Sequence, residues 1–236
     1  MKNLRNAVLM LLAAIALQTC NKASFKSEKM KTRTDSASYM LGVYYGNTLK
    51  RSKMEDINAH FFAKGVEDVI KNDSMPVSPH EINTFLNNYF AERQMDMEKK
   101  NKEEGEAFLK ENKTKPGVIE TASGLQYKVI QEGTGKSPQM GDTVICQYTG
   151  KLIDGKTFGS SYEGGQPAKF LLSSTGLIHG WQEGLQLMKE GGKYELYVPS
   201  QLAYGVQGRG QDIEPNSVLI FDIELLEVTP GKGSGK

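Results

Sequence analysis

The residues of the C-terminal half that could do chemistry are aromatic and aliphatic rather than nucleophilic. They recur within short glycine-containing strings, in the order Tyr148, Phe158, Ile178, the only tryptophan Trp181, Tyr204, Ile213 and Phe221. Together these side chains predict an aromatic-lined pocket that holds no plausible nucleophile. A dry pocket of this kind acts by binding a less charge-separated transition state better than a well-solvated ground state.

Other kinds of catalytic site find little support in the sequence. The three histidines are scattered, at His60, His80 and His179. The chain has only two cysteines, Cys20 and Cys146. A metal site or a Cys–His dyad needs such side chains to be clustered. The glycine-rich run 204–210 lacks the helix start and the lysine of a phosphate-binding loop. Cys146 lies on the apolar face of an expected strand, which favours a buried, inert thiol.

Several strings in one order resemble the FK506-binding-protein (FKBP) family of peptidyl-prolyl isomerases, from about Leu125 to Val228. The strings are Tyr148-Thr149-Gly150, Gly155-Lys156-Thr157-Phe158, Ile178-His179-Gly180-Trp181-Gln182-Glu183-Gly184-Leu185, Leu202-Ala203-Tyr204-Gly205 and Leu219-Ile220-Phe221-Asp222-Ile223-Glu224-Leu225-Leu226. The resemblance implies a bent antiparallel sheet wrapped on one short helix. It also implies a pocket that accepts proline-containing unfolded or partly folded proteins, and that could take a macrolide ligand.

The resemblance implies a role for each residue of the pocket. Trp181 would form the floor beneath the substrate proline ring. The walls would be Tyr148, Phe158, Leu177, Ile178 and Phe221. The Ile178 backbone N–H and the Tyr204 hydroxyl would hold substrate carbonyls. Ile213 would belong to a mobile loop, residues 205–215, that overhangs the pocket.

The expected reaction needs no cofactor. Amide resonance places a barrier of about 18–20 kcal/mol in the way of rotation about a peptide bond, although an X-Pro bond prefers trans by only about 0.5–1 kcal/mol. The twisted transition state has lost much of the charge separation of the planar amide. An apolar pocket therefore favours the transition state over the ground state, with no base, nucleophile or metal.

Three positions depart from the family's pattern. Gly159 stands where an acid often follows the pocket phenylalanine, and Gly164 where an arginine is common. Ala168 stands where an aromatic wall residue is common. These departures predict a pocket that is wider and less polar on one side. They also leave an alternative open, a non-catalytic chaperone or peptide-binding lipoprotein with a degenerate isomerase pocket.

The N-terminus is typical of a targeting segment, expected over residues 1–19. Lys2 and Arg5 precede an apolar run, residues 7–17, that is too short to span a bilayer comfortably. The run leads to Cys20 and resembles a bacterial lipoprotein signal, in which the cysteine is acylated. An ordinary signal peptide, with Cys20 incidental, is the alternative. Acylation would place the protein in the cell envelope, expected at the outer membrane facing the periplasm.

The remaining chain is expected to form a tether, a helical region and a second domain. Residues 20–34 predict a flexible tether, and residues 35–115 predict helices with a long final stalk. Residues 116–229 switch to the period of strands, and residues 230–236 predict a disordered tail. The fold class is therefore α+β.

The predicted helices begin near Asp35, at Asp56 and at Pro79. The last helix follows a capping box formed by Ser78 and Glu81, and runs to about Asn112. The charged run from Glu98 to Glu106 is interpreted as a solvated face.

The helical region carries more aromatic side chains than a unit this small readily hides, which predicts a homodimer. This arrangement also resembles the envelope members of the family, which carry a helical N-terminal dimerisation region. The chain is 38% hydrophobic and 24% charged, with a formal net charge of +1. A charge this small argues against nucleic acid as a partner.

Overall fold

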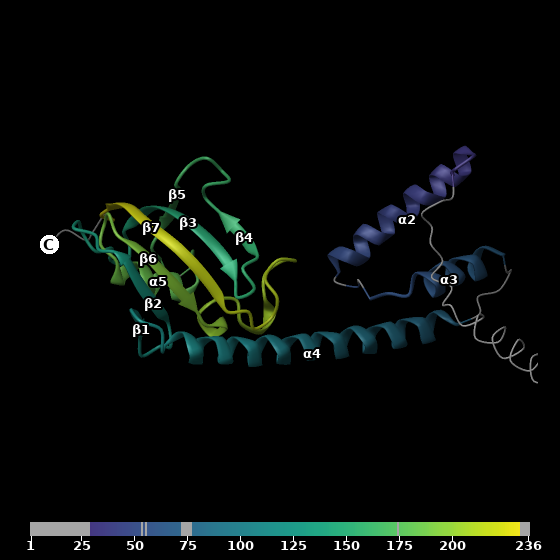
Figure 1. Ribbon diagram of the computed structural model, residues 1–236, viewed down its shortest axis with the longest axis horizontal. Helices are drawn as coiled ribbons and strands as arrows, with labels where there is room; N and C mark the ends of the chain where they lie inside the picture. The colour runs from purple at the N-terminus through teal and green to yellow at the C-terminus, as the bar shows by residue number, and fades with distance from the viewer. Residues whose placement is uncertain (1–28, 53, 55, 72–76, 174, 232–236) are drawn as a thin grey trace, which may run out of the picture. The chain divides into compact units, whose positions relative to one another are not determined.

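The computed structural model describes residues 29–52, 54, 56–71, 77–173 and 175–231 (Figure 1). The expected signal peptide and Cys20 lie outside these residues, as do most of the expected tether and of the tail. The chain divides into two compact units, one ending at Ile57 and the other beginning at Asn58. Within the described ranges, no helix combines the length and the apolar content needed to cross a membrane.

The first unit contains helix α2, Arg33–Arg51. A capping box begins it, because the Thr32 hydroxyl accepts from the Asp35 N–H at 3.0 Å and the Asp35 carboxylate accepts from the Thr32 N–H at 2.9 Å. The helix buries none of its described residues. Its large apolar side chains, among them Tyr39, Met40 and Tyr44, are exposed.

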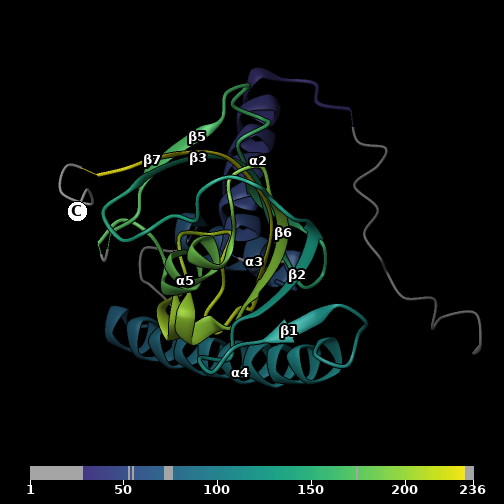
Figure 2. The ribbon, with the colours of Figure 1, turned by 90° about the vertical axis from the view of Figure 1, so that its left-hand side faces the viewer.

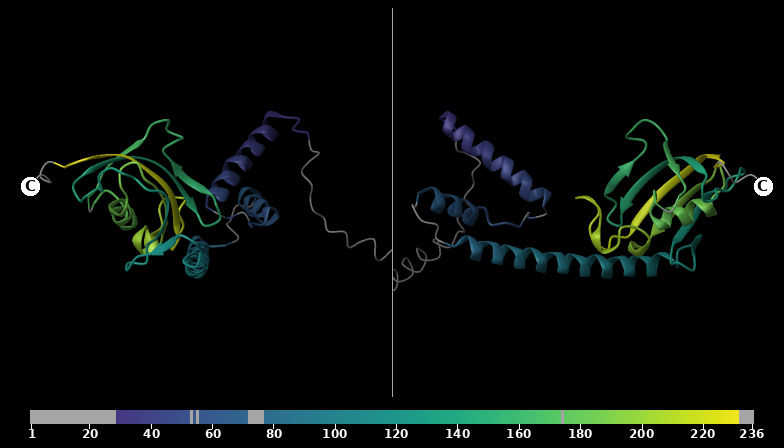
Figure 3. Two further views of the ribbon diagram at one scale, coloured as in Figure 1. Left: turned by 60° about the vertical axis from the view of Figure 1, so that its left-hand side comes forward. Right: turned by 180° about the vertical axis from the view of Figure 1, so that it is seen from behind.

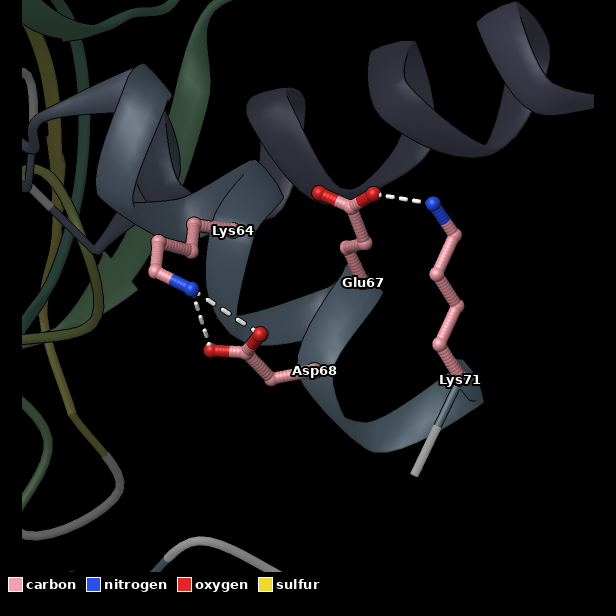
Figure 4. Close-up of polar contacts among 4 residues, drawn as sticks. All are labelled: Lys64, Glu67, Asp68 and Lys71. Carbon is pink, nitrogen blue, oxygen red and sulfur yellow. Dashed lines mark hydrogen bonds and ion pairs between the residues drawn. The ribbon is translucent and has the colours of Figure 1, made fainter.

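The second unit starts with helix α3, Ala59–Lys71. The predicted start at Asp56 is wrong by three residues, because the Asn58 side chain accepts from the backbone N–H groups of His60 and Phe61 and so caps the helix here. Two pairs four residues apart, Lys64–Asp68 and Glu67–Lys71, form ion pairs on the exposed surface of α3 (Figure 4).

The apolar side chains of α3 are also exposed in the single chain. Helical spacing places Phe62, Val66, Val69 and Ile70 on the side of α3 away from the ion pairs. None of them is buried, and Ile70 is 77% exposed. The helix is therefore amphipathic, with both of its faces accessible in the described chain.

Helix α4, Pro79–Asn112, has the predicted start and end. The Ser78 hydroxyl accepts from the Glu81 N–H, and the Glu81 carboxylate accepts from the Ser78 N–H at 3.0 Å. Pro79 occupies the first turn, where its missing N–H removes no helical hydrogen bond.

The last turns of α4 contact the sheet-containing part of the second unit (Figure 1). Within the charged run, Gly105 is buried, and a Cβ added there would lie 2.8 Å from a Val218 methyl. Further on, the Asn112 side chain donates to the buried Gln126 at 3.0 Å, and the Phe108 ring packs on Tyr197. The prediction of a solvated face for the charged run is therefore wrong at Gly105.

The described residues of the second unit form a seven-stranded antiparallel sheet. Its strands are β1 Val118–Glu120, β2 Gln126–Gln131, β3 Thr143–Leu152, β4 Thr157–Ser160, β5 Ala168–Leu171, β6 Lys193–Val198 and β7 Leu219–Thr229. The spatial order is β1-β2-β6-β7-β3-β4, with β5 paired to β3. The expected α+β fold with a bent antiparallel sheet is confirmed.

Helix α5, His179–Leu187, lies in the concave side of this bent sheet (Figures 2 and 3). Two glycines let the helix approach β6. A Cβ on Gly180 would lie 2.4 Å from Val198, and one on Gly184 would lie 2.4 Å from Leu196. This close contact buries Trp181 and Leu185 against the sheet and forms the core of the domain.

Candidate active site

A pocket of about 530 Å³ opens between α5, the sheet and the loop before β7. All eight predicted residues line it: Tyr148, Phe158, Leu177, Ile178, Trp181, Tyr204, Ile213 and Phe221. They come from separate strands, one helix and two loops, so the fold brings together residues that lie up to about seventy positions apart in the sequence. Their individual roles in the reaction stay predictions.

Trp181 is in contact with three aromatic rings of the pocket. The rings of Tyr148, Phe170 and Phe221 lie 5.2, 5.3 and 5.2 Å from the indole, at interplanar angles of 87°, 77° and 84°. Edge-to-face contacts of this kind are favourable aromatic geometry. Trp181 and these three rings therefore form one aromatic cluster, and all four side chains line the pocket.

The indole N–H of Trp181 has no hydrogen-bond partner among the described residues, although the side chain is only 4% exposed. Buried polar groups are almost always hydrogen-bonded, and exceptions gather at functional sites. The unpartnered N–H fits a tryptophan that serves a binding site as well as the core.

The fourth wall, Phe158 on β4, depends on a glycine in the neighbouring strand. Its ring meets Phe221 edge to face at 5.6 Å. A Cβ on Gly150 would lie 2.6 Å from the Phe158 ring and 2.9 Å from the Phe221 ring. Any larger residue at this position of β3 would push the two walls apart.

The entrance to α5 presents a backbone donor to the pocket. Ile178 is the N-cap residue, and its carbonyl accepts from the N–H groups of Trp181 and Gln182. Within the described part of the chain, the Ile178 N–H itself donates to no group. The buried Gln182 side chain donates to the Leu177 carbonyl at 2.7 Å and holds this turn in place.

The loop between β6 and β7, residues 205–216, covers one side of the site and is called the pocket loop below. Arg209 and Ile213 form an antiparallel bridge, with N···O distances of 2.7 and 3.2 Å. Ile213 is buried and belongs to the hydrophobic core of the domain. The Arg209 guanidinium donates to the Tyr204 hydroxyl at 2.5 Å and lies 5.2 Å from the centre of that ring.

Helix α4 contacts the base of the pocket loop. The Asn101 side chain donates to the Glu214 carboxylate at 2.8 Å and to the Pro215 carbonyl at 2.9 Å. The Asn216 side chain donates to the Glu98 carbonyl at 3.1 Å, and its backbone takes a positive φ of 59°. Asparagine tolerates this conformation better than most residues do. The loop that carries Ile213 is thus fixed at its C-terminal end by the long helix.

The three departures from the family pattern have different structural outcomes: Gly159 lines the pocket, whereas Gly164 and Ala168 do not. A Cβ on Gly159 would lie 3.9 Å from the Tyr148 hydroxyl, so no acid faces that tyrosine here. Ala168 does not line the pocket, but Phe170, two residues further on β5 and therefore on the same strand face, does. The expectation of a less polar rim overlooked two charged lining residues, Arg209 and Asp212.

Sequence reasoning thus missed Phe170, Gln182, Arg209 and Asp212 at this site. The alternation of β5 could have placed Phe170 on the pocket face beside Ala168. The two charged residues gave no such signal, because their positions depend on the backbone bridge within the pocket loop.

The Cys146 thiol plays no part in the pocket. It is fully buried in the core, and burial raises its pKa to about 12. A thiol that stays protonated is a poor nucleophile. This agrees with the interpretation of Cys146 as an inert core residue.

Comparison with known proteins gives two family matches along the chain. Residues 134–226 match the family described as FKBP-type peptidyl-prolyl cis-trans isomerase. Residues 34–129 match the domain described as amino terminal to FKBP-type peptidyl-prolyl isomerase.

Relatives match over most of the chain. Outer membrane protein MIP of Legionella longbeachae is 38% identical over 235 residues, covering 97% of both chains. The FKBP-type peptidyl-prolyl cis-trans isomerase FkpA of Escherichia coli K12 is 40% identical over 227 residues, covering 89% of this chain and 79% of the relative.

A solved structure agrees with these relatives. The crystal structure of FkpA from Escherichia coli superposes with a TM-score of 0.65 at 35% identity, covering 86% of this chain and 99% of that one. The pocket, its fold and these matches agree, and the chain belongs to the FKBP-type peptidyl-prolyl cis-trans isomerase family, as an enzyme of that class.

Proposed function

We propose that the pocket above Trp181 isomerises X-Pro bonds in unfolded or partly folded proteins of the bacterial cell envelope. The observation that carries this proposal is the cluster of three aromatic rings packed edge to face with one buried indole, all four lining the pocket. Its volume, about 530 Å³, lies within the range of small-molecule and cofactor sites. A proline ring with its flanking amides is small enough to enter it.

The proposed mechanism is differential binding of the twisted amide. The planar X-Pro amide is charge-separated and loses hydration in the aromatic pocket, whereas the twisted amide has less charge separation to lose. The Ile178 N–H and the Tyr204 hydroxyl then hold substrate carbonyls on either side of the bond. No step transfers a proton or forms a covalent bond.

A soluble chain beginning at Met30 tests this mechanism in a protease-coupled proline isomerisation assay. We expect acceleration over the uncatalysed rate, and lower kcat/KM for Trp181→Phe and Tyr204→Phe. Lys169→Gln, on the outer face of β5, is the control and should match the unsubstituted chain. Binding of proline peptides without any acceleration would favour the non-catalytic chaperone instead.

The helical region is proposed to form a homodimer. Neither α2 nor α3 buries any described residue within the single chain. Their exposed apolar side chains, together with those of the first turns of α4, include Tyr39, Met40, Tyr44, Phe61, Phe62, Val66, Val69, Ile70, Phe85 and Phe90. Exposed apolar area of this extent is typical of an interface that another chain covers. A symmetric pair of chains would cover it with one kind of contact.

Sedimentation of the soluble chain tests the dimer. We expect the mass of two chains, and a monomer for Val66→Asp, which places a charge on the apolar face of α3. Lys64→Ser lies on the opposite face and should leave the dimer intact. A monomeric unsubstituted chain would contradict the proposal.

A lipid anchor at Cys20 is proposed to hold this dimer at the envelope. The apolar run that ends at Cys20 supports it, as does a relative of 38% identity that is named an outer membrane protein. Two acyl chains on one cysteine would anchor the protein stably. Cys20→Ala should release the protein from the membrane fraction or leave the precursor uncut, and unchanged fractionation would contradict the anchor.

The pocket is also proposed to accept a macrolide in place of a client segment. The aromatic side chains that line the pocket support this proposal, since aromatic walls suit a large apolar ligand. Competitive inhibition in the isomerase assay would support it, and inhibition with no effect on peptide KM would not.

A further inference from the structure

Arg209 is a charged residue placed directly at the pocket and bound to a member of the expected site. Its guanidinium contacts Tyr204 in two ways, by a hydrogen bond of 2.5 Å to the hydroxyl and by stacking over the ring at 5.2 Å. The arginine donates in this bond, so the hydroxyl keeps its own proton for an acceptor in the pocket.

The backbone around Arg209 is built to present this side chain to the pocket. The residue is flanked by Gly208 and Gly210, which have positive φ angles of 61° and 60°. A Cβ on Gly208 would lie 2.3 Å from the Ile213 carbonyl, so only glycine fits beside the bridge between Arg209 and Ile213. The bridge fixes the backbone of Arg209 against a residue that itself lines the pocket.

The charges around the pocket are not balanced. Asp212, the acidic lining residue, is paired with Lys156 at 3.1 Å. Position 159, where a carboxylate would face Tyr148, is a glycine. Among the ion pairs of the described residues, none includes Arg209. The pocket rim therefore presents one unneutralised positive charge.

A guanidinium has five N–H donors in a planar fork that matches a carboxylate. One of those donors is engaged by Tyr204, which leaves the others available to a ligand. Since Arg209 is also exposed, an incoming segment can reach it without rearrangement of the core.

We propose that Arg209 is a specificity-determining residue that makes this isomerase prefer proline segments with an acidic residue next to the proline. The inference rests on the proposed isomerase function of the same pocket. Arg209 acts on the substrate through its charge, and on the reaction through its hold on the Tyr204 hydroxyl. The client class is thus an acidic X-Pro or Pro-X segment.

Acetyl-capped peptides that differ only in one residue test the proposal. Glutamate and glutamine are compared immediately before the proline and, in a second pair, immediately after it, and kcat/KM is measured by exchange spectroscopy without a protease. In at least one of the two registers we expect glutamate to be favoured about two- to fivefold at low salt, as suits an exposed charge pair. The preference should shrink at 0.5 M salt.

Variants separate the charge of Arg209 from its structural role. Arg209→Gln should abolish the glutamate-to-glutamine ratio, whatever it does to the absolute rate, and Arg209→Lys should retain part of it. Lys169→Gln removes a positive charge outside the pocket and should leave the ratio unchanged. The proposal is overturned by a ratio of one in both registers, or by a preference that survives in Arg209→Gln.

The glutamine peptides distinguish this failure from a failure of the proposed function. Turnover of those peptides without a charge preference removes the role of Arg209 and leaves the isomerase intact. No turnover of any peptide removes the proposed function itself.

Discussion

Gly159 leaves the Tyr148 hydroxyl without a hydrogen-bond partner among the described residues. A carboxylate at this position would extend from a Cβ that lies 3.9 Å from that hydroxyl, and could accept its proton. Such a bond would fix the orientation of a wall that contacts Trp181. The missing acid therefore predicts an enzyme that works, but more slowly than a relative with the full motif.

We expect turnover about ten- to a hundredfold below that of such a relative, a difference of about 1.4–2.7 kcal/mol in the barrier. Gly159→Asp together with Gly164→Arg should recover part of it, and Gly159→Asp alone should recover less, because only the double variant restores both members of the acid–arginine pattern of the full motif. The measurement is kcat/KM on one tetrapeptide for all variants. Gly159→Asn is the matched control, because asparagine has the size of aspartate but no charge. A double variant slower than the unsubstituted chain would contradict the argument.

Cys146 gives a second prediction at the same scale. Burial raises the pKa of its thiol from an ordinary 9.0 to about 12, so the folded protein holds far less thiolate at pH 8. A shift of this size lowers the thiolate fraction about a thousandfold. In the soluble chain beginning at Met30, the reaction with a disulfide reagent should therefore be at least that much slower before unfolding than after it.

An exposed thiol in the same chain provides the control. Lys169→Cys should react rapidly with one equivalent of reagent, while Cys146 remains protected. Rapid reaction of the unsubstituted folded chain would show that Cys146 is reachable and that its place in the core is wrong.

The elements differ in how far the sequence alone predicts them. Helix α4 could be predicted from end to end, because Ser78, Pro79 and Glu81 form a local start signal. The apolar spacing of Ile178, Trp181, Leu185 and Met188 predicts a short helix over about residues 178–188, which is within one residue of α5 at each end. The start of α3 was missed because Asp56 and Asn58 are both suitable helix caps. The apolar periodicity of the helix does not show which of the two residues caps it.

The packing of α4 against the sheet domain could not be read from the sequence. Its contact face consists of Asn101, Gly105, Phe108 and Asn112, and a stripe with a glycine and two asparagines has no apolar period. The pocket shows the same limit. Aromatic residues in family strings located its walls, whereas Arg209 depends on a loop bridge that only the fold reveals.

Gly105 tests the contact between α4 and the strand-bearing domain. A Cβ at this position would lie 2.8 Å from Val218, so Gly105→Leu should destabilise the protein by about 1–3 kcal/mol through overpacking. The measurement is urea unfolding of the soluble chain. Val218→Ala should cost less stability in the Gly105→Leu variant than in the unsubstituted chain. The reason is that the leucine at position 105 and Val218 compete for the same space, which the alanine frees.

Glu103→Leu is the matched control for the leucine itself, because Glu103 lies on the exposed side of the same helix. It should change the stability by no more than about 0.5 kcal/mol. Equal destabilisation by the two leucine substitutions would mean that α4 does not pack on the domain at Gly105.

At the scale of the whole molecule, the proposed dimer and the proposed reaction assign separate tasks to the exposed apolar faces of α2 and α3 and to the pocket of the sheet domain. In the proposed dimer, the exposed apolar side chains of the helices contact a second chain, and the pocket takes a short proline segment. In a dimer the two pockets can engage one unfolded client at two prolines. The second contact then forms at the effective concentration set by the first, which raises the avidity by about 10²–10⁴.

Val66→Asp separates these tasks, because it disturbs the proposed dimer interface and lies on a different helix from every pocket residue. On a tetrapeptide, which occupies one pocket at a time, the variant and the unsubstituted chain should have the same kcat/KM per pocket. On a refolding protein with several prolines, the variant should accelerate refolding at least about tenfold less, because linked binding is lost. Lys64→Ser, on the opposite face of α3, should match the unsubstituted chain in both assays. Equal activity of the Val66→Asp monomer on the refolding protein would show that pairing the two pockets contributes nothing to client binding, and that the helices serve another purpose.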